Sequence, residues 1–456
     1  MSTDADRPGA VGPGSRDAIA TTAQTPAAAP APTATPAVTP AATPAIGAAQ
    51  LLRNPGFVGL LVYRLLGMLS YQIVAVTVGW HVYEITHDAL ALGLIGLTEV
   101  IPYFCFALFA GYAVDHLPRR KLGLFACLGL LLTTLMLAGV ASGHLPTGAF
   151  GFGTLTIYAA IAVNGVVRAF LAPVYMSLFA RVLKREHYAR GAGVSSVVMQ
   201  TGLVLGPAMG GALVAWGGKT SAYLVAAGFA LAAAIAIISL RVTEPPAPAE
   251  RAPVFKSIGE GLRFVFNNQV VLGAQALDMF SVLFGGAVAL LPAFINDILH
   301  YGPEALGVLR AAPAAGAVLI GLWLAKHPPQ KNAGHLLLYA VAGFGLCIIG
   351  FALSRQFWLS AAMLMLSGMC DGVSVVLRST ILQLSTPDEM RGRVSSINGI
   401  FIGSSNELGA FESGLAARLM GLVPSVIFGG CMTLAVVGAT AKLAPKLRRL
   451  DLRDLQ

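Results

Sequence analysis

The sequence predicts an all-α polytopic membrane protein with twelve transmembrane helices, arranged as two six-helix repeats. Three observations predict this fold class: the apolar composition, a series of apolar segments long enough to span a membrane, and similarity between the two halves of the chain. Of the 456 residues, 56% are hydrophobic and only 11% are charged, with a mean hydropathy of +0.74. An average soluble chain carries about 25% charged residues, because its whole surface must be solvated. The composition therefore excludes a soluble protein.

Twelve apolar segments follow one another from Phe57 onward. A helix rises about 1.5 Å per residue, so roughly 20 apolar residues cross a hydrocarbon core of about 30 Å. The expected limits of the spans are 57–83, 90–114, 121–142, 150–180, 190–216, 220–241, 268–296, 304–325, 334–354, 357–384, 393–418 and 422–442.

Lysine and arginine residues lie almost entirely on one side of these spans. Twenty of them fall in the connections after even-numbered spans and in the C-terminal segment, whereas the opposite connections hold only Lys219 and Arg355. Because cytoplasmic loops retain Lys and Arg, both termini are predicted to be cytoplasmic. The net charge of +9 comes from these dispersed loop residues rather than from a clustered patch, so no nucleic-acid partner is expected.

The segments outside the spans divide the chain further. Residues 1–50 form an Ala/Pro/Thr-rich cytoplasmic tail that lacks the apolar core of a signal peptide, and we expect it to be disordered. The Pro- and Glu-rich stretch from Thr243 to Pro253 precedes an amphipathic pattern at 254–267, which predicts a linker and a helix on the membrane surface. The expected organisation is a tail at 1–50, a six-helix half at 51–241, a linker with an amphipathic helix at 242–267, a six-helix half at 268–442 and a basic cytoplasmic tail at 443–456.

The two halves repeat short motifs in the same order. Parallel six-helix repeats of this kind are the architecture of one large class of transporters. The matching pairs are Ala91-Leu-Gly93 with Ala305-Leu-Gly307, Asn164-Gly-Val166 with Asp371-Gly-Val373, and Arg190-Gly-Ala-Gly-Val-Ser-Ser196 with Arg391-Gly-Arg-Val-Ser-Ser396.

The connection between spans two and three reads Gly111-Tyr-Ala-Val-Asp115-His-Leu-Pro-Arg119-Arg120-Lys121. Gly111 would let two helices approach closely, Asp115 would end the span, and Arg119 or Arg120 could pair with Asp115 or with a facing helix terminus. A positively charged cytoplasmic loop after a capped helix is the simpler alternative. The sequence resembles the loop signature of the major facilitator superfamily, which implies a gating role; the second half has Ala325 where the acid should be.

Span five carries a second motif, a series of small residues around a proline. Small residues four apart permit tight helix packing, and a proline removes a backbone hydrogen bond where the helix can bend. A purely structural helix contact is the alternative. The pattern resembles the signature of the superfamily's proton-antiporting exporters, which implies gating by Gly202, Gly206, Pro207, Gly210 and Gly211.

The stretch at about 370–430 resembles the bacterial enterobactin-exporter group of this superfamily. The resemblance rests on Arg378-Ser-Thr-Ile-Leu-Gln383, on Thr386-Pro-Asp-Glu-Met-Arg-Gly-Arg-Val394 and on the run from Phe401 to Gly414. It implies a monomeric multi-pass protein of the bacterial inner membrane that exports a small molecule, a siderophore first and drug-like compounds as the alternative, in exchange for protons. A membrane enzyme is not expected, because no HExxH, GxSxG or Walker sequence is present; the lack of an ATP site also predicts gradient-driven transport without a cofactor.

Ionisable residues within the spans are the candidate functional residues. Each costs about 2.5–3.5 kcal/mol at the bilayer centre on insertion scales, so it needs a partner, water or a function. In the superfamily, spans one, four, seven and ten line the central cavity. The resemblance would place Arg64, Arg168, Asp278, Asp371 and Arg378 near this cavity. There the guanidinium groups of Arg64, Arg168 and Arg378 suit an anionic or catechol-bearing ligand. Buried carboxylates could exchange protons, with Asp278 and Asp371 as the leading candidates and Glu99 next. The alternative is a static helix–helix pair, such as Asp371 with Arg378, and we favour a structural role for the charges of span eleven. The nine such residues considered are Arg64, Glu99, Arg168, Asp278, Arg310, Asp371, Arg378, Glu407 and Glu412.

The five cysteines fall in apolar stretches with no CxxC pair and no adjacent histidine cluster, so no metal site is expected.

Overall fold

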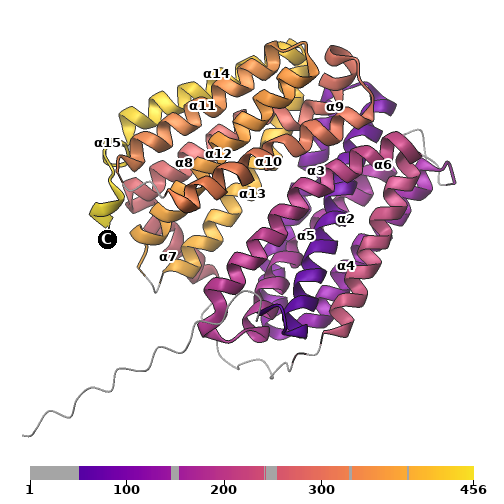
Figure 1. Cartoon of the computed structure of the whole chain (residues 1–456), viewed down its shortest axis with the longest axis horizontal. Helices are drawn as coiled ribbons and strands as arrows, with labels where there is room; N and C mark the ends of the chain where they lie inside the picture. The colour runs from indigo at the N-terminus through magenta and orange to yellow at the C-terminus, as the bar shows by residue number, and fades with distance from the viewer. Residues whose placement is uncertain are drawn as a thin grey trace, which may run out of the picture. The chain divides into compact units, whose positions relative to one another are not determined.

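The computed structural model describes residues 51–144, 154–240, 242, 254–327, 331–387 and 390–455, and these residues form helices without any strand (Figure 1). The expected tail at 1–50 and linker at 243–253 lie outside the described residues. The helices of the first half are α2 (Pro55–Thr86), α3 (Ala89–His116), α4 (Arg119–Ala141), α5 (Leu155–Val182) and α6 (Tyr188–Ser239), with the short η2 (Arg185–His187) before α6.

The second half begins after a separate helix, α7 (Val254–Asn267), which coincides with the amphipathic pattern predicted at 254–267. The helices that follow are α8 (Gln269–Phe284), η3 (Ala287–Leu290), α9 (Leu291–Phe294), η4 (Ile295–Leu299), α10 (Pro303–Lys326), α11 (Ala333–Leu353), α12 (Phe357–Ser385), α13 (Arg391–Met420), α14 (Leu422–Leu443), α15 (Pro445–Arg448) and η5 (Leu452–Leu455).

Polar N-caps mark where several of these helices begin. Asn54 accepts hydrogen bonds from two backbone N–H groups at the start of α2, and Asn268 does the same at the start of α8. Asp88 caps α3 by accepting a 2.9 Å hydrogen bond from the N–H of Leu90. These side chains satisfy donors that have no partner within the helix, and so fix the first turn of each span.

The long apolar helices confirm a polytopic membrane fold. Ten helices within the described residues are long and apolar enough to cross a membrane. One of them, α6, has 52 residues, or about 78 Å of helix, more than twice the membrane core. Gly218 divides α6 with a φ of +74°, where the sequence predicts the boundary between spans five and six. The count of twelve spans itself stays a prediction.

Span seven differs from the continuous helix expected at 268–296. Regular helix ends at Phe284, and Gly285 and Gly286 lead into the short segments η3, α9 and η4. A Cβ atom on Gly286 would lie 2.6 Å from the carbonyl oxygen of Gly409 in α13. The break therefore allows the backbone of α13 to approach where a side chain would prevent it.

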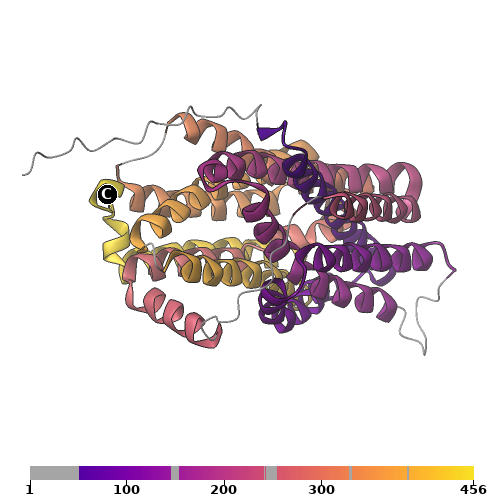
Figure 2. The same ribbon diagram turned by 90° about the horizontal axis from the view of Figure 1, so that it is seen from below.

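The C-terminal segment, predicted as a basic tail at 443–456, is packed against the second half rather than free (Figure 2). Leu447 in α15 is fully buried, and Leu450 and Leu452 are also buried against the start of α11 and part of α8. The N–H of Gly334 donates a 3.1 Å hydrogen bond to the carbonyl of Leu450. The basic residues predicted a tail, but the leucines between them, Leu447, Leu450 and Leu452, bury apolar surface against the helices and hold the segment in place.

Candidate functional site

A cavity of about 110 Å³ lies where helices of both halves meet. Helices α2, α3 and α5 contribute from the first half, and η3, α10 and α13 from the second. The lining residues that carry a polar side chain are Tyr71, Glu99, Asn164, Arg310 and Glu407.

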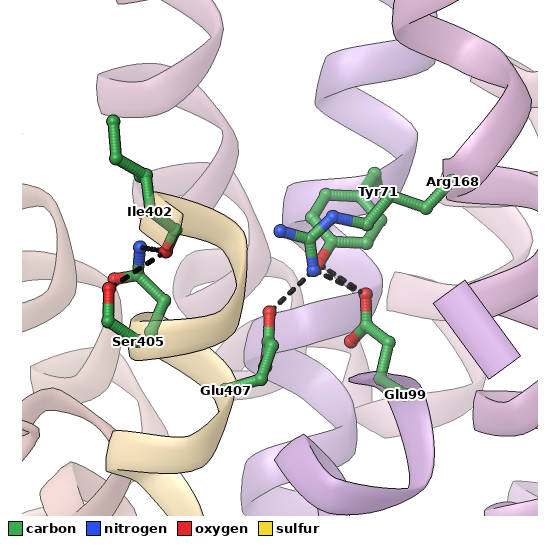
Figure 3. Close-up of polar contacts among 7 residues, drawn as sticks. Tyr71, Glu99, Arg168, Ile402, Ser405 and Glu407 are labelled. Atoms are coloured by element: carbon green, nitrogen blue, oxygen red, sulfur yellow. Dashed lines mark hydrogen bonds and ion pairs between the residues drawn. The ribbon is translucent and has the colours of Figure 1, made fainter. Parts of the chain in front are cut away.

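Arg168 on α5 forms ion pairs with both carboxylates of this lining (Figure 3). Its Nη1 lies 2.9 Å from Oε1 of Glu99 on α3 and 2.5 Å from Oε1 of Glu407 on α13. The hydroxyl of Tyr71 donates a 2.8 Å hydrogen bond to the same oxygen of Glu99. One guanidinium thus joins an acid of its own half to an acid of the other half.

Aromatic rings complete the surroundings of Arg168. The carbon at the centre of the guanidinium lies 5.5 Å from the ring centroid of Tyr71 and 5.4 Å from that of Tyr103. Both rings are within the range of cation–π attraction, which keeps the arginine side chain in place alongside its ion pairs.

Arg310 on α10 is the cationic residue of the cavity lining. Within the described residues it makes neither a hydrogen bond nor an ion pair, although it lies near Glu407, Glu99 and Tyr71. The cavity lining therefore carries two carboxylates and one guanidinium group, and both carboxylates are paired with Arg168, which is not itself a lining residue.

A second charged cluster lies within the second half. Arg378 on α12 forms an ion pair with Asp278 on α8, and its Nε donates a 3.1 Å hydrogen bond to Oγ of Ser374. Asp371 on α12 lies near this pair and interacts electrostatically with both Asp278 and Arg378. The static pair considered between Asp371 and Arg378 is thus replaced by a pair across two helices, between Arg378 and Asp278.

Arg64 on α2 lies in the first half, apart from both charged clusters. It donates a 2.5 Å hydrogen bond to Oγ of Ser195 and lies 4.1 Å from the ring centroid of Tyr175 on α5. Arg64 and Asp278 each follow the N-cap asparagine of the first helix of their half, Asn54 or Asn268, by ten residues. Equivalent positions of the two repeats therefore carry opposite charges, and each contacts the fourth helix of its own half.

The structure separates residues that the family resemblance places around one cavity. Glu99 and Arg168 are brought together, Asp278, Asp371 and Arg378 form a cluster of their own, and Arg64 lies apart from both. Glu407, which we expected to be structural, and Arg310, to which no role was given, line the cavity instead. Their position within a span was visible in the sequence, but their partners on other helices were not.

Charged residues of span eleven also form a contact at the end of α13. Nη1 of Arg418 lies 2.8 Å from Oδ2 of Asp88, the N-cap of α3. This pair links the two halves at the surface, in keeping with the structural role expected for Arg418.

The loop motif after α3 anchors neighbouring helices. Arg119 is buried, and its Nε donates a 2.8 Å hydrogen bond to Oγ of Ser177 on α5. Arg120 donates to the carbonyls of Ile237 and Ile238 at the C-terminus of α6, the facing-terminus arrangement that the sequence suggested.

The roles expected for Asp115 and Gly111 of this motif are not seen in the described residues. The side chain of Asp115 lies outside the described residues. The close helix approach expected at Gly111 is not found: a Cβ there would meet no described atom within 4 Å. The spacing of the motif could not show which face of α3 the glycine occupies.

The glycine motif of α6 packs against both halves. A Cβ on Gly202, Gly206 or Gly210 would meet Met68, Gln72 or the Ile73–Val76 turn of α2, at 2.7, 2.5 and 3.2 Å respectively. Gly211 instead faces α10 of the second half. Pro207 lies within the helix, and the residue at which α6 leaves helical geometry is Gly218.

Neither charged cluster has the composition of a metal site. Among the described residues, no group of three or more His, Cys, Asp or Glu side chains could hold a metal ion. The arrangement can instead bind and release protons, or a small charged ligand, through its carboxylates and guanidinium groups.

A family model described as Major Facilitator Superfamily matches residues 60–410. Among curated relatives, the multidrug efflux pump Tap of Mycolicibacterium fortuitum is 27% identical over 394 residues, covering 83% of this chain and 93% of the relative. The enterobactin exporter EntS of Escherichia coli is 26% identical over 411 residues, covering 86% of this chain and 94% of the relative.

Solved structures share the fold at low sequence identity. A bacterial homologue of the human lysosomal transporter Spinster, in an inward-facing and unoccupied conformation, has a TM-score of 0.64 at 15% identity, covering 88% of this chain and 97% of the other. The nucleoside transporter NupG has a TM-score of 0.63 at 12% identity, covering 85% of this chain and 98% of the other.

Proposed function

The chain belongs to the major facilitator superfamily, and from that premise we propose that it is a proton-coupled secondary active exporter of a small molecule across the bacterial inner membrane. The observation that carries this proposal is the ion-pair network in which Arg168 of the first half is held by Glu99 and Glu407 from opposite halves. Titratable groups at such a junction can link proton binding to the relative movement of the halves.

The proposed substrate is a siderophore, with drug-like compounds as the alternative. Both possibilities are supported by relatives of similar identity, since one is an enterobactin exporter and another a multidrug efflux pump. The cavity of about 110 Å³ is smaller than the roughly 300–1,000 Å³ of typical ligand pockets, so substrate entry requires it to widen.

Proton coupling is proposed for Glu99 in the cavity and for Asp278 and Asp371 in the second cluster. Arg168 and Arg378 already bind carboxylates in this structure. They become available to a ligand only when those acids are protonated or displaced. Arg64, which contacts the uncharged side chains of Ser195 and Tyr175, is the third arginine proposed for substrate binding.

The proposed orientation places both termini in the cytoplasm, with the protein a monomer in membrane lipid. In this orientation, the contacts of Gly211 with Gly307 and of Asp88 with Arg418 lie toward the periplasm. We propose that this arrangement is closed on the periplasmic side and loads substrate from the cytoplasm.

Transport assays with the purified full chain test this function. Proteoliposomes that hold the protein in the inside-out orientation and have an acidic lumen should accumulate a catecholate siderophore or a drug probe such as ethidium. A protonophore should abolish this uptake. Asp278→Asn, Asp371→Asn and the double variant should retain ligand exchange without a gradient but lose uphill transport. Uphill transport by the double variant with unchanged pH dependence would remove both acids from the coupling mechanism.

A further inference from the structure

We infer that Cys347 of α11 and Cys370 of α12 form a dithiol site within the membrane, which an apolar hydroperoxide converts into a disulfide that links the two helices. The site and its chemistry do not depend on the substrate or the direction of transport. Three observations support the site: a contact between the two thiols, their depth in the membrane and their partial exposure.

The two thiols are already in contact. They are hydrogen-bonded to one another, whereas the remaining cysteines, Cys105, Cys127 and Cys431, have no hydrogen-bonded thiol partner among the described residues. A hydrogen bond donated to a sulfur atom stabilises its thiolate, which is the form that attacks an oxidant. The contact therefore brings the two sulfur atoms together and also activates one of them.

Glycines of α11 create the space for this contact. A Cβ on Gly343 would lie 2.9 Å from Sγ of Cys370, and a Cβ on Gly350 would lie 2.8 Å from Sδ of Met363. Cys347 lies one turn from each of these glycines, on the face of α11 that packs against α12. Sulfur atoms of α12 thus enter notches in α11 on both sides of Cys347.

The directions of the two cysteine side chains also converge. Helices α11 and α12 are joined by residues 354–356 and run antiparallel, and each side chain leans toward the N-terminus of its own helix. Cys347 lies one turn closer to this connection than Gly343 and leans away from it. Cys370 lies opposite Gly343 and leans toward the connection. The sulfur atoms therefore need to close only the distance between a hydrogen bond and a disulfide bond of about 2.05 Å.

Both thiols lie near the middle of the membrane and are partly open to lipid. Gly343, opposite Cys370, is the central residue of α11. Cys347 and Cys370 are each partly exposed, and the neighbouring Leu346 and Leu366 are 60% and 41% exposed. Apolar side chains that are exposed at this depth face hydrocarbon, so a reagent must dissolve in the bilayer to reach the thiols. This location selects an organic hydroperoxide, such as a peroxidised acyl chain, over a charged oxidant.

The reaction balances in two steps. The thiolate of one cysteine attacks the hydroperoxide, an S–O bond forms as the O–O bond breaks, and the thiol proton passes to the departing alkoxide to give an alcohol. The second thiol then displaces water from the sulfenic acid and forms the S–S bond. Two thiols and one hydroperoxide thus give a disulfide, an alcohol and water, with the thiols oxidised by two electrons and the peroxide reduced.

The disulfide attaches α12 to α11 beside the second charged cluster. Asp371 directly follows Cys370 and interacts electrostatically with Cys370 and with Arg378. A covalent link at Cys370 therefore restrains the turn of α12 that carries Asp371, and it also removes conformational freedom from the unfolded chain. Both effects favour the folded second half.

Oxidation of the purified full chain in liposomes tests this inference. Cumene hydroperoxide, the apolar probe, should link the tryptic peptides 332–355 and 356–378, because trypsin cleaves after Arg355, between the two cysteines. Mass spectrometry without reduction detects the linked peptides, and dithiothreitol should separate them. Peroxymonosulfate, a charged oxidant, should form the link about tenfold more slowly or less, because hydrocarbon excludes it. The melting temperature should rise by about 3 °C or more on linking, and it should not rise in Cys347→Ser.

Glycine variants separate the geometry of the site from the mere presence of two cysteines. Gly343→Ala should push the Cys370 thiol out of its notch and slow linking by about fivefold or more. Gly350→Ala, the matched control, crowds Met363 instead and should link at close to the wild-type rate. The exposed Cys105 and Cys431 serve as unpaired thiols in the same sample and should not appear in linked peptides.

Four results would each overturn the inference. They are the absence of the linked peptides, equal linking in Gly343→Ala and Gly350→Ala, equal rates with the two oxidants, and a melting temperature that does not change on linking. None of these measurements involves transport, so the proposed function stands or falls separately.

Discussion

Gly211 of α6 and Gly307 of α10 bring the backbones of the two halves into direct contact. A Cβ on Gly211 would lie 2.4 Å from the backbone nitrogen of Gly307, closer than the 3.0 Å below which something must shift. The obstructing atoms belong to the backbone and cannot rotate away. The contact therefore requires glycine at these positions and couples the packing of α6 to the conformation of the transporter.

Gly211→Ala should separate the halves at this contact and lower the stability of the present conformation by about 1–3 kcal/mol, as expected for overpacking. Accessibility of an introduced cysteine at Thr220 and thermal unfolding in detergent would show the shift. Gly228→Ala on the same helix is the matched control, because its Cβ would meet nothing described within 4 Å. Equal behaviour of the two variants would argue against a conformational role for the contact.

Arg168→Gln should destabilise the protein by leaving two acids in the cavity without their shared cation. The expected cost is somewhat below the roughly 3–5 kcal/mol of a fully buried pair, because the arginine side chain is 28% exposed. Melting temperature in detergent measures the effect. Adding Glu99→Gln and Glu407→Gln should recover most of the loss; failure to recover would mean that packing on Tyr71 and Tyr103, rather than charge, dominates.

Arg378→Gln should also be destabilising, because it leaves Asp278 unpaired within the bundle. The double variant Asp278→Asn with Arg378→Gln should be more stable than the sum of the single effects predicts, with a coupling energy of about 0.5–3 kcal/mol. Thermal unfolding of the four proteins gives the cycle. Ser374→Ala, which removes the 3.1 Å hydrogen bond to Nε alone, is the control for loss of a neutral contact; additive single effects would contradict the pair.

Leu447→Ala should loosen the attachment of the C-terminal segment by about 2–5 kcal/mol, since this leucine is fully buried against the start of α11 and part of α8. Proteolysis of residues 443–456 should become faster. Leu443→Ala, at a position that is 77% exposed, should leave the proteolysis rate close to wild type. A similar rate for both variants would show that the segment dissociates regardless of this contact.

The orientation predicted from the cations can be checked by labelling. In a chain without its native cysteines, Ser257→Cys should be protected from an impermeant reagent added to intact cells, and Thr220→Cys should react. The expected result follows from the excess of Lys and Arg in the connections assigned to the cytoplasm. The opposite pattern would invert the proposed direction of every step above.

The sequence by itself determined the fold class and most helix boundaries. Apolar length predicted the helices, and the expected span limits near 216–220 and 268 lie where Gly218 interrupts α6 and where Asn268 caps α8. These features depend on neighbours along the chain, so one sequence contains the information needed to find them. The family resemblance, carried by local motifs, was confirmed for the same reason.

Only the tertiary structure decided which charges meet. The sequence shows three isolated ionisable residues, Arg168, Glu99 and Glu407. Arg168 is 69 residues from Glu99 and 239 residues from Glu407 along the chain. Their pairing depends on the rotation of each helix about its axis, and that rotation is set by interlocking side chains and glycine contacts on several helices at once. The break at Gly285 and Gly286 has the same origin. The ring of Phe344 in α11 lies where a side chain of Gly285 would be, and the backbone of α13 lies where a side chain of Gly286 would be; both are distant in sequence.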